Sequence, residues 1–342
     1  MNRIIIVTNS ITGGGAERSM NLLANSLFEQ GIPVTLITIN ESDPDAVLVK
    51  CPIISINRKW NGSLLNTINS WIKFQKILIE LNASVLILNC DLPEFYGGTA
   101  FTRAKIICVE HSDHPWQKRQ KLGRVIRKIL KLRGVIWVAV SYHLNIWPSQ
   151  KEPKLVINNL VWESGRPLPL DGGAIKRLIY IGRLSNEKNP ELFLEIANET
   201  KIPAVIIGDG ELKYELQKFV ISKNIKVEFK GFLQDPWVLL NNGDLLIITS
   251  KWEGDGLVAV EAIQRGVPLI VSNIYAFKRF QLPMENYARN KLEYVTLILQ
   301  NQMNSQIFRV SLEKKIQILE GRDKKIITSK WSNLIDLVVK KS

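Results

Sequence analysis

The feature that most constrains the fold of this chain is a regular alternation of short apolar runs with longer segments of helical spacing. Short, continuous apolar runs are typical of strands that are buried on both faces of a parallel sheet. Helices are predicted between the runs, for example over Ala16–Gln30 and Leu65–Leu81. This alternation implies βαβ units. In the first half of the chain the predicted strands are Arg3–Thr8, Val34–Ile39, Val85–Leu88, Lys105–Val109 and Val135–Val140.

A second series of the same kind follows the loop Gly165–Gly173, whose proline and glycine content marks a linker. The sequence therefore predicts an α/β protein with two doubly wound, Rossmann-like domains facing a cleft. We place the domains at residues 1–165 and 174–327, with a linker at 166–173 and a terminal segment at 328–342 that contains an amphipathic helix, about Ser329–Lys341. The predicted strands of the second domain are Leu178–Ile181, Ala204–Ile207, Val227–Phe229, Asp244–Ile248 and Pro268–Val271.

Composition agrees with two folded domains and excludes several classes of protein. With 342 residues, 46% of them hydrophobic, the chain can bury two cores of ordinary size, so disorder is not expected. Cys51, Cys90 and Cys108 are far apart and lie in or beside apolar stretches, which indicates reduced core residues. The first apolar run is too short for a signal peptide, and no run approaches the roughly 20 residues that span a bilayer. We expect a cytoplasmic protein, soluble or peripheral on the inner face of the cytoplasmic membrane.

Three glycines, Gly13–Gly15, follow the first predicted strand and open the first predicted helix. Glycines at such a position let the backbone approach a ligand closely, and the helix N-terminus favours an anion. A dinucleotide fingerprint starting at Gly13 would require glycine where Arg18 stands, and no Gly-Lys pair supports a P-loop. The loop is interpreted as an anion-binding loop, with a strand-to-helix turn that holds no ligand as the alternative.

Two cations, Arg183 and Lys188, follow the first predicted strand of the second half, ahead of a helix that begins after Pro190. Open α/β sheets bind ligands at the carboxyl ends of their strands. A guanidinium can grip two oxygens and an ammonium supplies a mobile point charge, so this pair suits a diphosphate. The alternative is that both are ordinary surface charges.

The segment Lys251–Gly266 combines two spaced glutamates with glycines that free the backbone. Glu253 lies in a loop after a predicted strand, and Glu261 lies in a helix that begins near Leu257. The amides of residues 256–258 would point at an anion. Carboxylates beside these amides and two cations can accept hydrogen bonds from sugar hydroxyls, so neither glutamate has to be an acid or a base.

These elements, in their order along the chain, resemble the family-4 glycosyltransferases of the GT-B fold, of the bacterial cell-envelope polysaccharide type. The resemblance covers nearly the whole chain and includes the family's two glutamates separated by seven residues, at Glu253 and Glu261. The other segments that carry the resemblance are Gly13–Arg18, Val138–Ser141, Val156–Asn159, Gly182–Lys188, Gly208–Glu211 and Lys230–Phe232.

The resemblance implies a retaining glycosyltransferase that needs neither a metal ion nor another cofactor. Its donor would be a nucleotide diphosphate sugar, a UDP-sugar in preference to a GDP-sugar, bound mainly to the second domain. The diphosphate would be neutralised by Arg183, Lys188 and the helix amides. The acceptor would be a saccharide or lipid-linked saccharide in surface polysaccharide, capsule or lipopolysaccharide biosynthesis. The last helix would return to the first domain.

The resemblance also implies roles for single residues. Glu253 would bind a hydroxyl of the donor sugar and Glu261 the ribose, while His111, which follows a first-domain strand, would touch the donor sugar. The neighbouring Glu110 would only orient His111. The implied catalytic residues are Glu253, His111, Arg183 and Lys188. The implied donor-binding residues are Gly14, Gly15, Arg183, Lys188, Gly208, Gly231, Phe232, Asp255, Gly256, Leu257, Val258 and Glu261.

Two positions depart from the family pattern. Thr249 replaces a common proline, and Asp255 stands where the family usually has an aromatic or small apolar residue. We expect Asp255 to cap the helix at Leu257, with a hydrogen bond to an unusual donor sugar as the alternative.

Residues 116–133 contain many cations and no acid, whereas the net charge of +13 is otherwise spread over both halves of the chain. Apolar residues recur there at helical spacing, which predicts a basic amphipathic helix. The helix would lie on an anionic membrane surface or beside a lipid-linked acceptor, and the alternative is a core-packed helix with a solvated basic face. Its expected contact residues are Lys118, Arg119, Lys121, Arg124, Arg127, Lys128 and Lys131.

Two other functions stay open on the sequence alone. One is a nucleotide-sugar epimerase or phosphorylase on the same fold, and the other is a basic nucleic-acid-binding protein. No aromatic interleaving of the kind found in RNA-reading modules accompanies the basic residues, so nucleic acid is not an expected partner.

Overall fold

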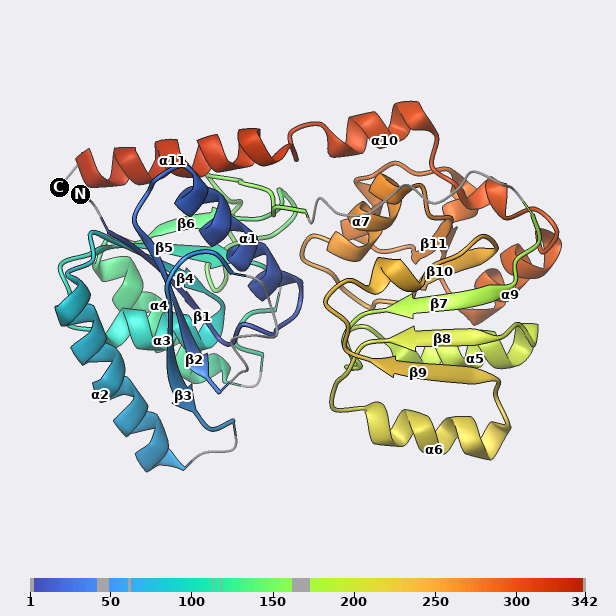
Figure 1. Cartoon of the computed structure of the whole chain (residues 1–342), viewed down its shortest axis with the longest axis horizontal. Helices are drawn as coiled ribbons and strands as arrows, with labels where there is room; N and C mark the ends of the chain where they lie inside the picture. The colour runs from blue at the N-terminus through green and yellow to red at the C-terminus, as the bar shows by residue number, and fades with distance from the viewer. Residues whose placement is uncertain are drawn as a thin grey trace. The chain divides into compact units, whose positions relative to one another are not determined.

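The computed structural model describes residues 3–41, 49–60, 63–112, 114–117, 119–161 and 173–340. The chain forms two compact units (Figure 1). The first unit comprises Met1–Val161 with Gly321–Ser342, and the second comprises Trp162–Glu320. Of the predicted linker 166–173, only Gly173 lies within the described residues.

The first unit contains a six-stranded, fully parallel sheet with the strand order β3-β2-β1-β4-β5-β6. Five of its strands are the predicted apolar runs, and most of their side chains are buried because helices cover both faces of the sheet. The edge strand β3 was not predicted, because its Ile-Ile-Ser-Ile-Asn-Arg sequence is not a continuous apolar run. The strands are β1 (Ile4–Thr8), β2 (Val34–Asn40), β3 (Ile53–Arg58), β4 (Val85–Asn89), β5 (Lys105–Glu110) and β6 (Ile136–Ala139).

Helices cover both faces of this first sheet (Figure 1). Apolar side chains of α1 and α11 pack with one face, around Ile4, Ile87 and Trp331. Those of α2, α3 and α4 pack with the other face, around Phe74, Tyr96 and Ile126. The helices are α1 (Gly15–Glu29), α2 (Leu64–Leu81), α3 (Asp91–Thr99), α4 (Gln120–Leu132) and α11 (Lys324–Lys340).

The last helix, α11, returns to the first unit, as the resemblance implies. The Ser26 and Thr328 hydroxyls of α1 and α11 lie 2.6 Å apart in a buried hydrogen bond, and Trp331 is buried in the core. The helix begins at Lys324, earlier than the predicted Ser329. The reason is a cap that the prediction overlooked, because the Asp323 carboxylate accepts hydrogen bonds from the first-turn amides of residues 325 and 326.

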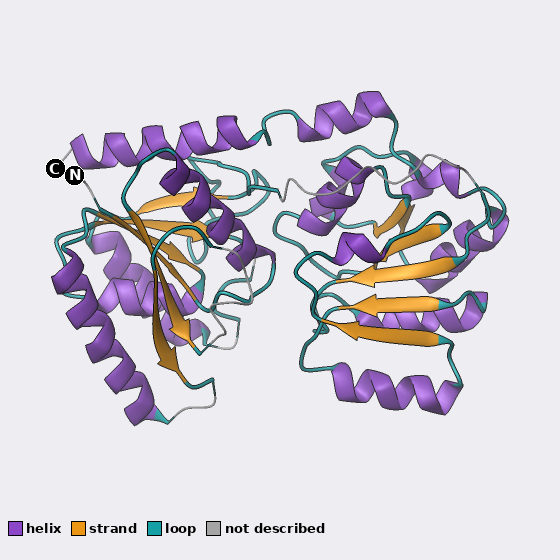
Figure 2. Ribbon diagram, viewed as in Figure 1, coloured by secondary structure: helices purple, strands orange, loops and turns teal. Residues whose placement is uncertain are grey.

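The second unit repeats the same architecture, with helices packed around a central sheet (Figure 2). Its sheet is fully parallel, with the strand order β12-β11-β10-β7-β8-β9. Its core is centred on Phe193, Leu245 and Tyr294. The predicted strands are all present, and the two-residue edge strand β12 was too short to predict. The strands are β7 (Arg177–Ile181), β8 (Ala204–Ile207), β9 (Val227–Gly231), β10 (Asp244–Ile248), β11 (Leu269–Ser272) and β12 (Tyr287–Ala288).

In the second unit α5, α6, α7 and α8 lie between successive strands, and α9 and α10 follow the last strand, β12. Within the described residues of the whole chain, none of the helices is both long enough and apolar enough to cross a membrane. The helices of this unit are α5 (Pro190–Thr200), α6 (Lys213–Lys223), α7 (Leu257–Arg265), α8 (Tyr275–Lys278), α9 (Lys291–Gln300) and α10 (Leu312–Leu319), with the 3-10 turns η2 (Pro236–Leu239), η3 (Met284–Asn286) and η4 (Ser305–Phe308).

Candidate active site

Glycine loops form the surface at the carboxyl ends of β7, β8 and β9. The amide of Gly208 donates to the carbonyl of Gly231 at 2.7 Å, and the amide of Gly182 donates to the carbonyl of Ile207 at 3.0 Å. Gly208 has φ +151°, and a Cβ there would lie 1.9 Å from the carbonyl oxygen of Gly182. Only glycine lets these loops approach each other so closely. Phe232 follows this surface directly, and its ring is half-exposed.

The two predicted cations lie in the loop that leaves β7. Arg183 is exposed, and its carbonyl accepts a hydrogen bond of 2.8 Å from the buried Tyr180 hydroxyl. The hydroxyl of Thr249, at the end of β10, lies 3.0 Å from the carbonyl of Lys188 and 2.8 Å from that of Asn189. Thr249, a departure from the family pattern, therefore ties the Lys188 loop to the neighbouring strand.

Glu253 and Lys188 form an ion pair at the carboxyl edge of the second sheet. Lys188 Nζ lies 2.7 Å from Glu253 Oε2, and the side chains are 26% and 11% exposed. The Ser250 hydroxyl donates to the other carboxylate oxygen of Glu253 at 2.7 Å. Lys188 and Glu253 are sixty-five positions apart in the sequence and were predicted to belong to one site. The structure brings them into contact.

The helix α7 begins at Leu257, shortly after Glu253 in the sequence. Its N-cap is Gly256, with φ +62°, and a Cβ at that residue would lie 2.6 Å from the ring of Phe277. Leu257 and Val258 are the first helical residues and are half-buried. First-turn amides have no partner inside a helix, so this end of α7 can donate hydrogen bonds to an anion.

Glu261, further along α7, is buried with an indole as its partner. Trp237 Nε1 donates a hydrogen bond of 2.8 Å to Glu261 Oε2. The guanidinium of Arg265 lies 5.0 Å from the centroid of the Trp237 ring and donates to the carbonyl of Glu261. The sequence did not indicate Trp237 as a site residue, because nothing in its spacing from Glu261 reveals that η2 packs against α7.

The expectation that Asp255 caps α7 is wrong. The cap position is occupied by Gly256, and the Asp255 carboxylate is paired with the Arg279 guanidinium, which also donates to the Asp255 carbonyl at 2.5 Å. Asp255 is buried, so its charge is balanced inside the protein by this partner. Arg279 follows α8 and was not predicted as part of the site.

In the first unit, the glycine loop is held by the first turn of α1. Gly14 is the N-cap of the helix and Gly15 its first residue. Glu17 is buried, accepts a hydrogen bond of 3.2 Å from Asn9 Nδ2, and lies so close to Gly13 that a Cβ there would be 2.4 Å from its side chain. His111 directly follows β5 and is half-buried.

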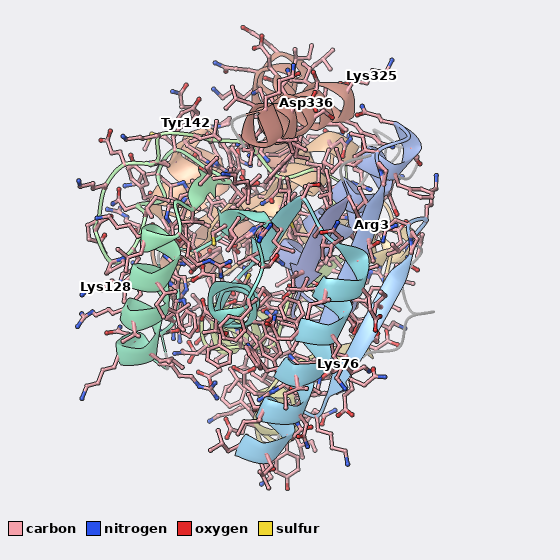
Figure 3. The ribbon with its side chains drawn as sticks, turned by 90° about the vertical axis from the view of Figure 1, so that its left-hand side faces the viewer. Arg3, Lys76, Lys128, Tyr142, Lys325 and Asp336 are labelled. Carbon is pink, nitrogen blue, oxygen red and sulfur yellow. The ribbon has the colours of Figure 1, made fainter. Side chains whose placement is uncertain are left out.

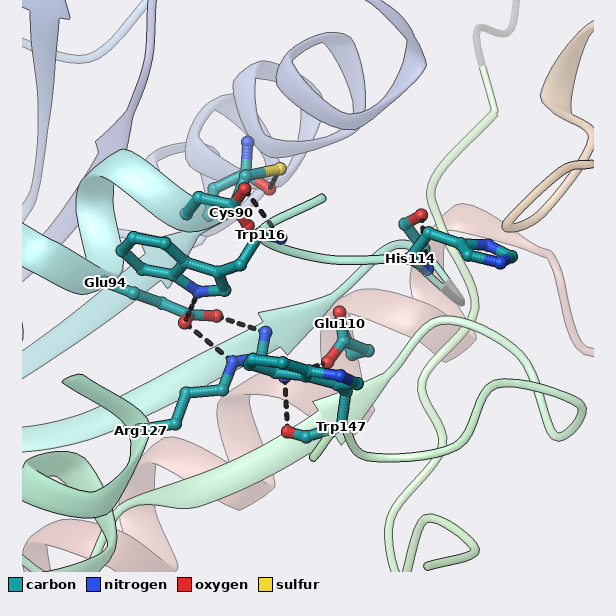
Figure 4. Close-up of polar contacts among 10 residues, drawn as sticks. Cys90, Glu94, Glu110, His114, Trp116, Arg127 and Trp147 are labelled. Carbon is teal, nitrogen blue, oxygen red and sulfur yellow. Dashed lines mark hydrogen bonds and ion pairs between the residues drawn. The ribbon is translucent and has the colours of Figure 1, made fainter. Parts of the chain in front are cut away.

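Arg127 is not a surface contact, contrary to expectation. It is 3% exposed and lies between two carboxylates, with Nη2 2.7 Å from Glu94 Oε1 and Nη1 2.6 Å from Glu110 Oε2 (Figure 4). It also stacks at 4.6 Å from the centroid of the Trp137 ring, and the Trp116 indole donates to Glu94 at 2.8 Å. The helical pattern alone did not reveal that one cation of α4 faces inward.

This cluster holds more acidic than basic groups. Burial and the nearby acids raise the pKa of Glu110 to about 8 despite Arg127, and burial and Glu94 raise the pKa of Asp91 to about 6. The hydrogen bond from Arg127 to Glu110 is a contact that the sequence did not predict. Trp116 is buried ahead of α4, where a Cβ on Gly123 would collide with its ring.

The remaining predicted contact residues of the basic helix are exposed where the structure describes them. Lys118 lies outside the described residues. The exposed cations are Arg119, Lys121, Arg124, Lys128 and Lys131.

The two units match two known families of domain. A family model described as "Glycosyltransferase Family 4" matches residues 13–160, and one described as "Glycosyl transferases group 1" matches residues 173–282. Together with two parallel Rossmann-like sheets, these matches define a glycosyltransferase of the GT-B fold. Within that class, the chain belongs to the family-4 glycosyltransferases.

Relatives of similar sequence are bacterial glycosyltransferases. One is the Campylobacter jejuni GalNAc-alpha-(1->4)-GalNAc-alpha-(1->3)-diNAcBac-PP-undecaprenol alpha-1,4-N-acetyl-D-galactosaminyltransferase, 27% identical over 292 residues, which are 80% of each chain. Another is the Escherichia coli UDP-Gal:alpha-D-GlcNAc-diphosphoundecaprenol alpha-1,3-galactosyltransferase, 25% identical over 248 residues, 63% of this chain and 64% of the relative.

Solved structures confirm the fold. Anabaena Alr3699/HepE in complex with UDP and glucose superposes with a TM-score of 0.79 at 15% identity, covering 98% of this chain and 100% of that chain. Staphylococcus aureus TarM in a complex with UDP gives a TM-score of 0.77 at 16% identity, with the same coverage of both chains.

Proposed function

We propose that the protein transfers a sugar from a UDP-sugar to a lipid-linked saccharide in cell-envelope polysaccharide assembly, with retention of anomeric configuration and without a metal ion. Both relatives described above carry diphosphoundecaprenol-linked saccharides in their names, and one name specifies UDP-Gal as its donor. Two solved structures of the same fold contain UDP. These names supply the donor and acceptor classes of the proposal.

The observation that carries the proposal is the Lys188–Glu253 ion pair at the carboxyl edge of the second sheet. Both side chains remain partly exposed, so incoming ligands can reach them. A diphosphate would draw the ammonium of Lys188 and the guanidinium of Arg183, while Glu253 would accept a hydrogen bond from a sugar hydroxyl. A cation and a carboxylate side by side fit the two ends of a nucleotide sugar: its phosphates and its hydroxyls.

The helix α7, which follows the loop that carries Glu253, also supports a nucleotide-sugar site here. Its N-terminal amides at Gly256, Leu257 and Val258 would donate to the diphosphate or the sugar. Glu261, held by Trp237, would accept hydrogen bonds from the ribose. The backbone at Gly208 and Gly231, followed directly by the half-exposed Phe232, would lie against the flat base.

Leaving-group stabilisation supplies the chemistry in this proposal. As the bond from the anomeric carbon to the diphosphate breaks, negative charge grows on the phosphate oxygens, and Arg183, Lys188 and the α7 amides are preorganised to stabilise it. The acceptor oxygen then bonds to the anomeric carbon from the face that the diphosphate leaves, and its proton passes to the departing phosphate. This route retains configuration and needs neither a protein nucleophile nor a metal ion.

The family resemblance also gives residues of the first unit a part in the reaction. Gly14 and Gly15 would approach the leaving group through their backbone, and His111 would contact the donor sugar. The Glu17 carboxylate under Gly13 supports the loop conformation on which this role depends. Asp255 takes no direct part in this scheme, because Arg279 already balances its charge.

Product analysis tests the proposal. The purified protein is incubated with a panel of UDP-sugars and GDP-sugars, with or without an undecaprenyl-diphosphate-linked saccharide, in buffer containing EDTA. We expect one UDP-sugar to yield a lipid product heavier by one sugar, whose anomeric NMR coupling matches that of the donor. Sugar isomerisation without an acceptor would instead identify an epimerase, a GDP-sugar as the only donor would correct the donor, and loss of activity in EDTA would contradict metal independence.

A further inference from the structure

An exposed apolar strip with a basic border crosses the helical layer formed by α2, α3 and α4. We name this surface, made of the exposed side chains of residues 63–82, 101–105 and 119–132, the α2–α4 face. The third helix of this layer, α3, carries no exposed side chain, so α2 and α4 provide most of the outer surface. Figure 3 shows Lys76 on α2 and Lys128 on α4, each pointing away from the core.

The apolar side chains of α2 lie on one side of its exposed surface. Leu65, Ile68, Ile72 and Ile79 are exposed and follow one another at intervals of three, four and seven residues. At helical periodicity these intervals place them in one stripe. An ordinary solvated helix would carry polar residues at such positions, so this stripe indicates a binding surface.

Phe101 extends the stripe toward α4. Its ring is 81% exposed and lies edge-on to Trp71 of α2, with centroids 6.0 Å apart. Its amide donates to Gln75 Oε1 at 2.8 Å. Since Trp71 and Gln75 each follow a stripe residue, Ile68 and Ile72, by three positions, Phe101 lies along the apolar side of α2.

The C-terminal end of α4 lies on the other side of Phe101. Arg133 Nη1 donates to the carbonyls of Gly98 and Ala100, at 3.0 and 2.9 Å, so this end of α4 borders the segment that carries Phe101. Leu132, next to Arg133, is 81% exposed. Val125, two helical turns earlier on the same face of α4, is also exposed. The apolar strip therefore runs from α2 through Phe101 to α4.

Cations border this strip on both helices. Within the described part of residues 63–134, Glu80 is the one exposed acidic side chain, and the described residues contain no ion pair to a cation of this face. Nothing else in this surface offsets its positive charge. The exposed cations of the two helices and of the segments beside them are Lys73, Lys76, Arg103, Lys105, Arg119, Lys121, Arg124, Lys128 and Lys131. Of these, Lys73 donates to the carbonyls of Ser55 and Ile56.

We propose that the α2–α4 face docks on an anionic lipid bilayer, with the apolar strip entering the interface and the cations contacting lipid phosphates. Aliphatic side chains interleaved with lysine and arginine are typical of surfaces that bind the membrane interface. A second copy of the chain would set two strongly basic faces against each other, which disfavours a dimer through this surface. The proposal extends the proposed function, because a lipid-linked acceptor is held at such a bilayer.

Vesicle co-sedimentation tests the proposal with two variants of the face. Lys121→Gln/Arg124→Gln/Lys128→Gln/Lys131→Gln removes four cations, and Ile72→Ser/Phe101→Ser/Leu132→Ser removes apolar contacts without changing charge. We expect each variant to lower partitioning onto phosphatidylglycerol-containing vesicles at least tenfold. The wild type should bind these vesicles at least tenfold more strongly than pure phosphatidylcholine vesicles. Equal binding to both lipids, or unchanged partitioning of either variant, would overturn the proposal.

A matched control variant separates the effect of the cations on the α2–α4 face from the effect of the protein's net charge. Lys218→Gln/Lys223→Gln/Lys226→Gln/Lys330→Gln removes the same charge from exposed positions outside the face and should leave partitioning within twofold. An equal loss in this control would overturn the proposal, as would a lipid-free dimer that the apolar variant converts to monomers. UDP affinity, measured in the same samples, reports on the donor site separately: if UDP fails to bind, the proposed function fails while the vesicle result still stands.

Discussion

The indole nitrogen of Trp237 donates a hydrogen bond of 2.8 Å to the carboxylate of Glu261, and both side chains are buried. Glu261 lies on α7 and Trp237 on η2, so the bond fixes the orientation of the carboxylate. In the proposed function this carboxylate accepts hydrogen bonds from the ribose. Trp237 would then be a positioning residue for the donor, acting through Glu261.

Replacing Trp237 by Phe removes this N–H donor while keeping an aromatic ring in the packing. A hydrogen bond to a charged group contributes roughly 1.5–3 kcal/mol, so we expect KM for the donor to rise about tenfold or more with a smaller change in kcat. Discrimination between UDP and 2′-deoxy-UDP in competitive inhibition should also fall, which a general loss of packing would not produce.

The matched control for this prediction lies in the first unit. Trp71 Nε1 donates to Thr99 Oγ1 at 2.9 Å, so Trp71→Phe loses an indole hydrogen bond to a neutral hydroxyl away from the donor site. Its steady-state kinetics should match those of the wild type. Equal preference for UDP over 2′-deoxy-UDP in wild type and Trp237→Phe would show that Trp237 does not position Glu261 for the ribose.

The tight contact between Gly208 and Gly182 leads to a second prediction, on donor affinity and thermal stability. In Gly208→Ala the new methyl group would lie 1.9 Å from a backbone oxygen, at a φ of +151° that side chains rarely adopt, so the loops must separate. We expect donor affinity to fall by at least tenfold and the thermal midpoint of the protein to drop by several degrees. Gly173→Ala, whose Cβ would meet nothing within 4 Å, should change neither in differential scanning fluorimetry or UDP titration.

Much of the fold followed from the sequence, because strands buried on both faces are continuous apolar runs. Where that condition fails, prediction fails too: β3 mixes polar and apolar residues at a sheet edge, and β12 has only two residues. The start of α11 was misplaced because the signal is a single capping residue, Asp323.

The candidate site was predictable where a charged residue closely follows a predicted strand. Lys188 and Glu253 each follow a strand of the same sheet, so parallel topology brings them to one edge. Contacts made across the fold could not be predicted in this way. The Trp237–Glu261 bond, the Asp255–Arg279 pair and the inward turn of Arg127 all depend on packing between elements distant in sequence.

The buried cluster around Arg127 predicts a pH dependence of stability. The pKa of Glu110 is raised to about 8 by burial, with Glu94 and Asp91 nearby adding to the effect and Arg127 opposing it. A carboxyl whose folded pKa is raised stabilises the protein fully below its ordinary pKa, and this contribution is lost as pH rises toward about 8. We expect the urea midpoint, followed by tryptophan fluorescence, to fall between pH 5 and pH 8.

Glu110→Gln should flatten this profile, because the amide keeps an acceptor for Arg127 but does not titrate. Glu29→Gln serves as the control, since Lys50 and Lys324 lower the pKa of that exposed carboxylate and its contribution has the opposite sign. A Glu110→Gln profile as steep as that of the wild type would contradict the assignment.

In the proposed function, the carboxyl edge of the second sheet binds a nucleotide diphosphate through Lys188. Isothermal titration calorimetry with UDP and with uridine tests this claim on the wild type, on Lys188→Met and on Lys201→Met, which removes an exposed cation beyond the C-terminal end of α5. We predict that Lys188→Met weakens UDP binding at least thirtyfold, leaves uridine binding unchanged and abolishes transfer, while Lys201→Met binds both ligands like the wild type. UDP affinity that survives the loss of Lys188 would place the diphosphate elsewhere and contradict the account.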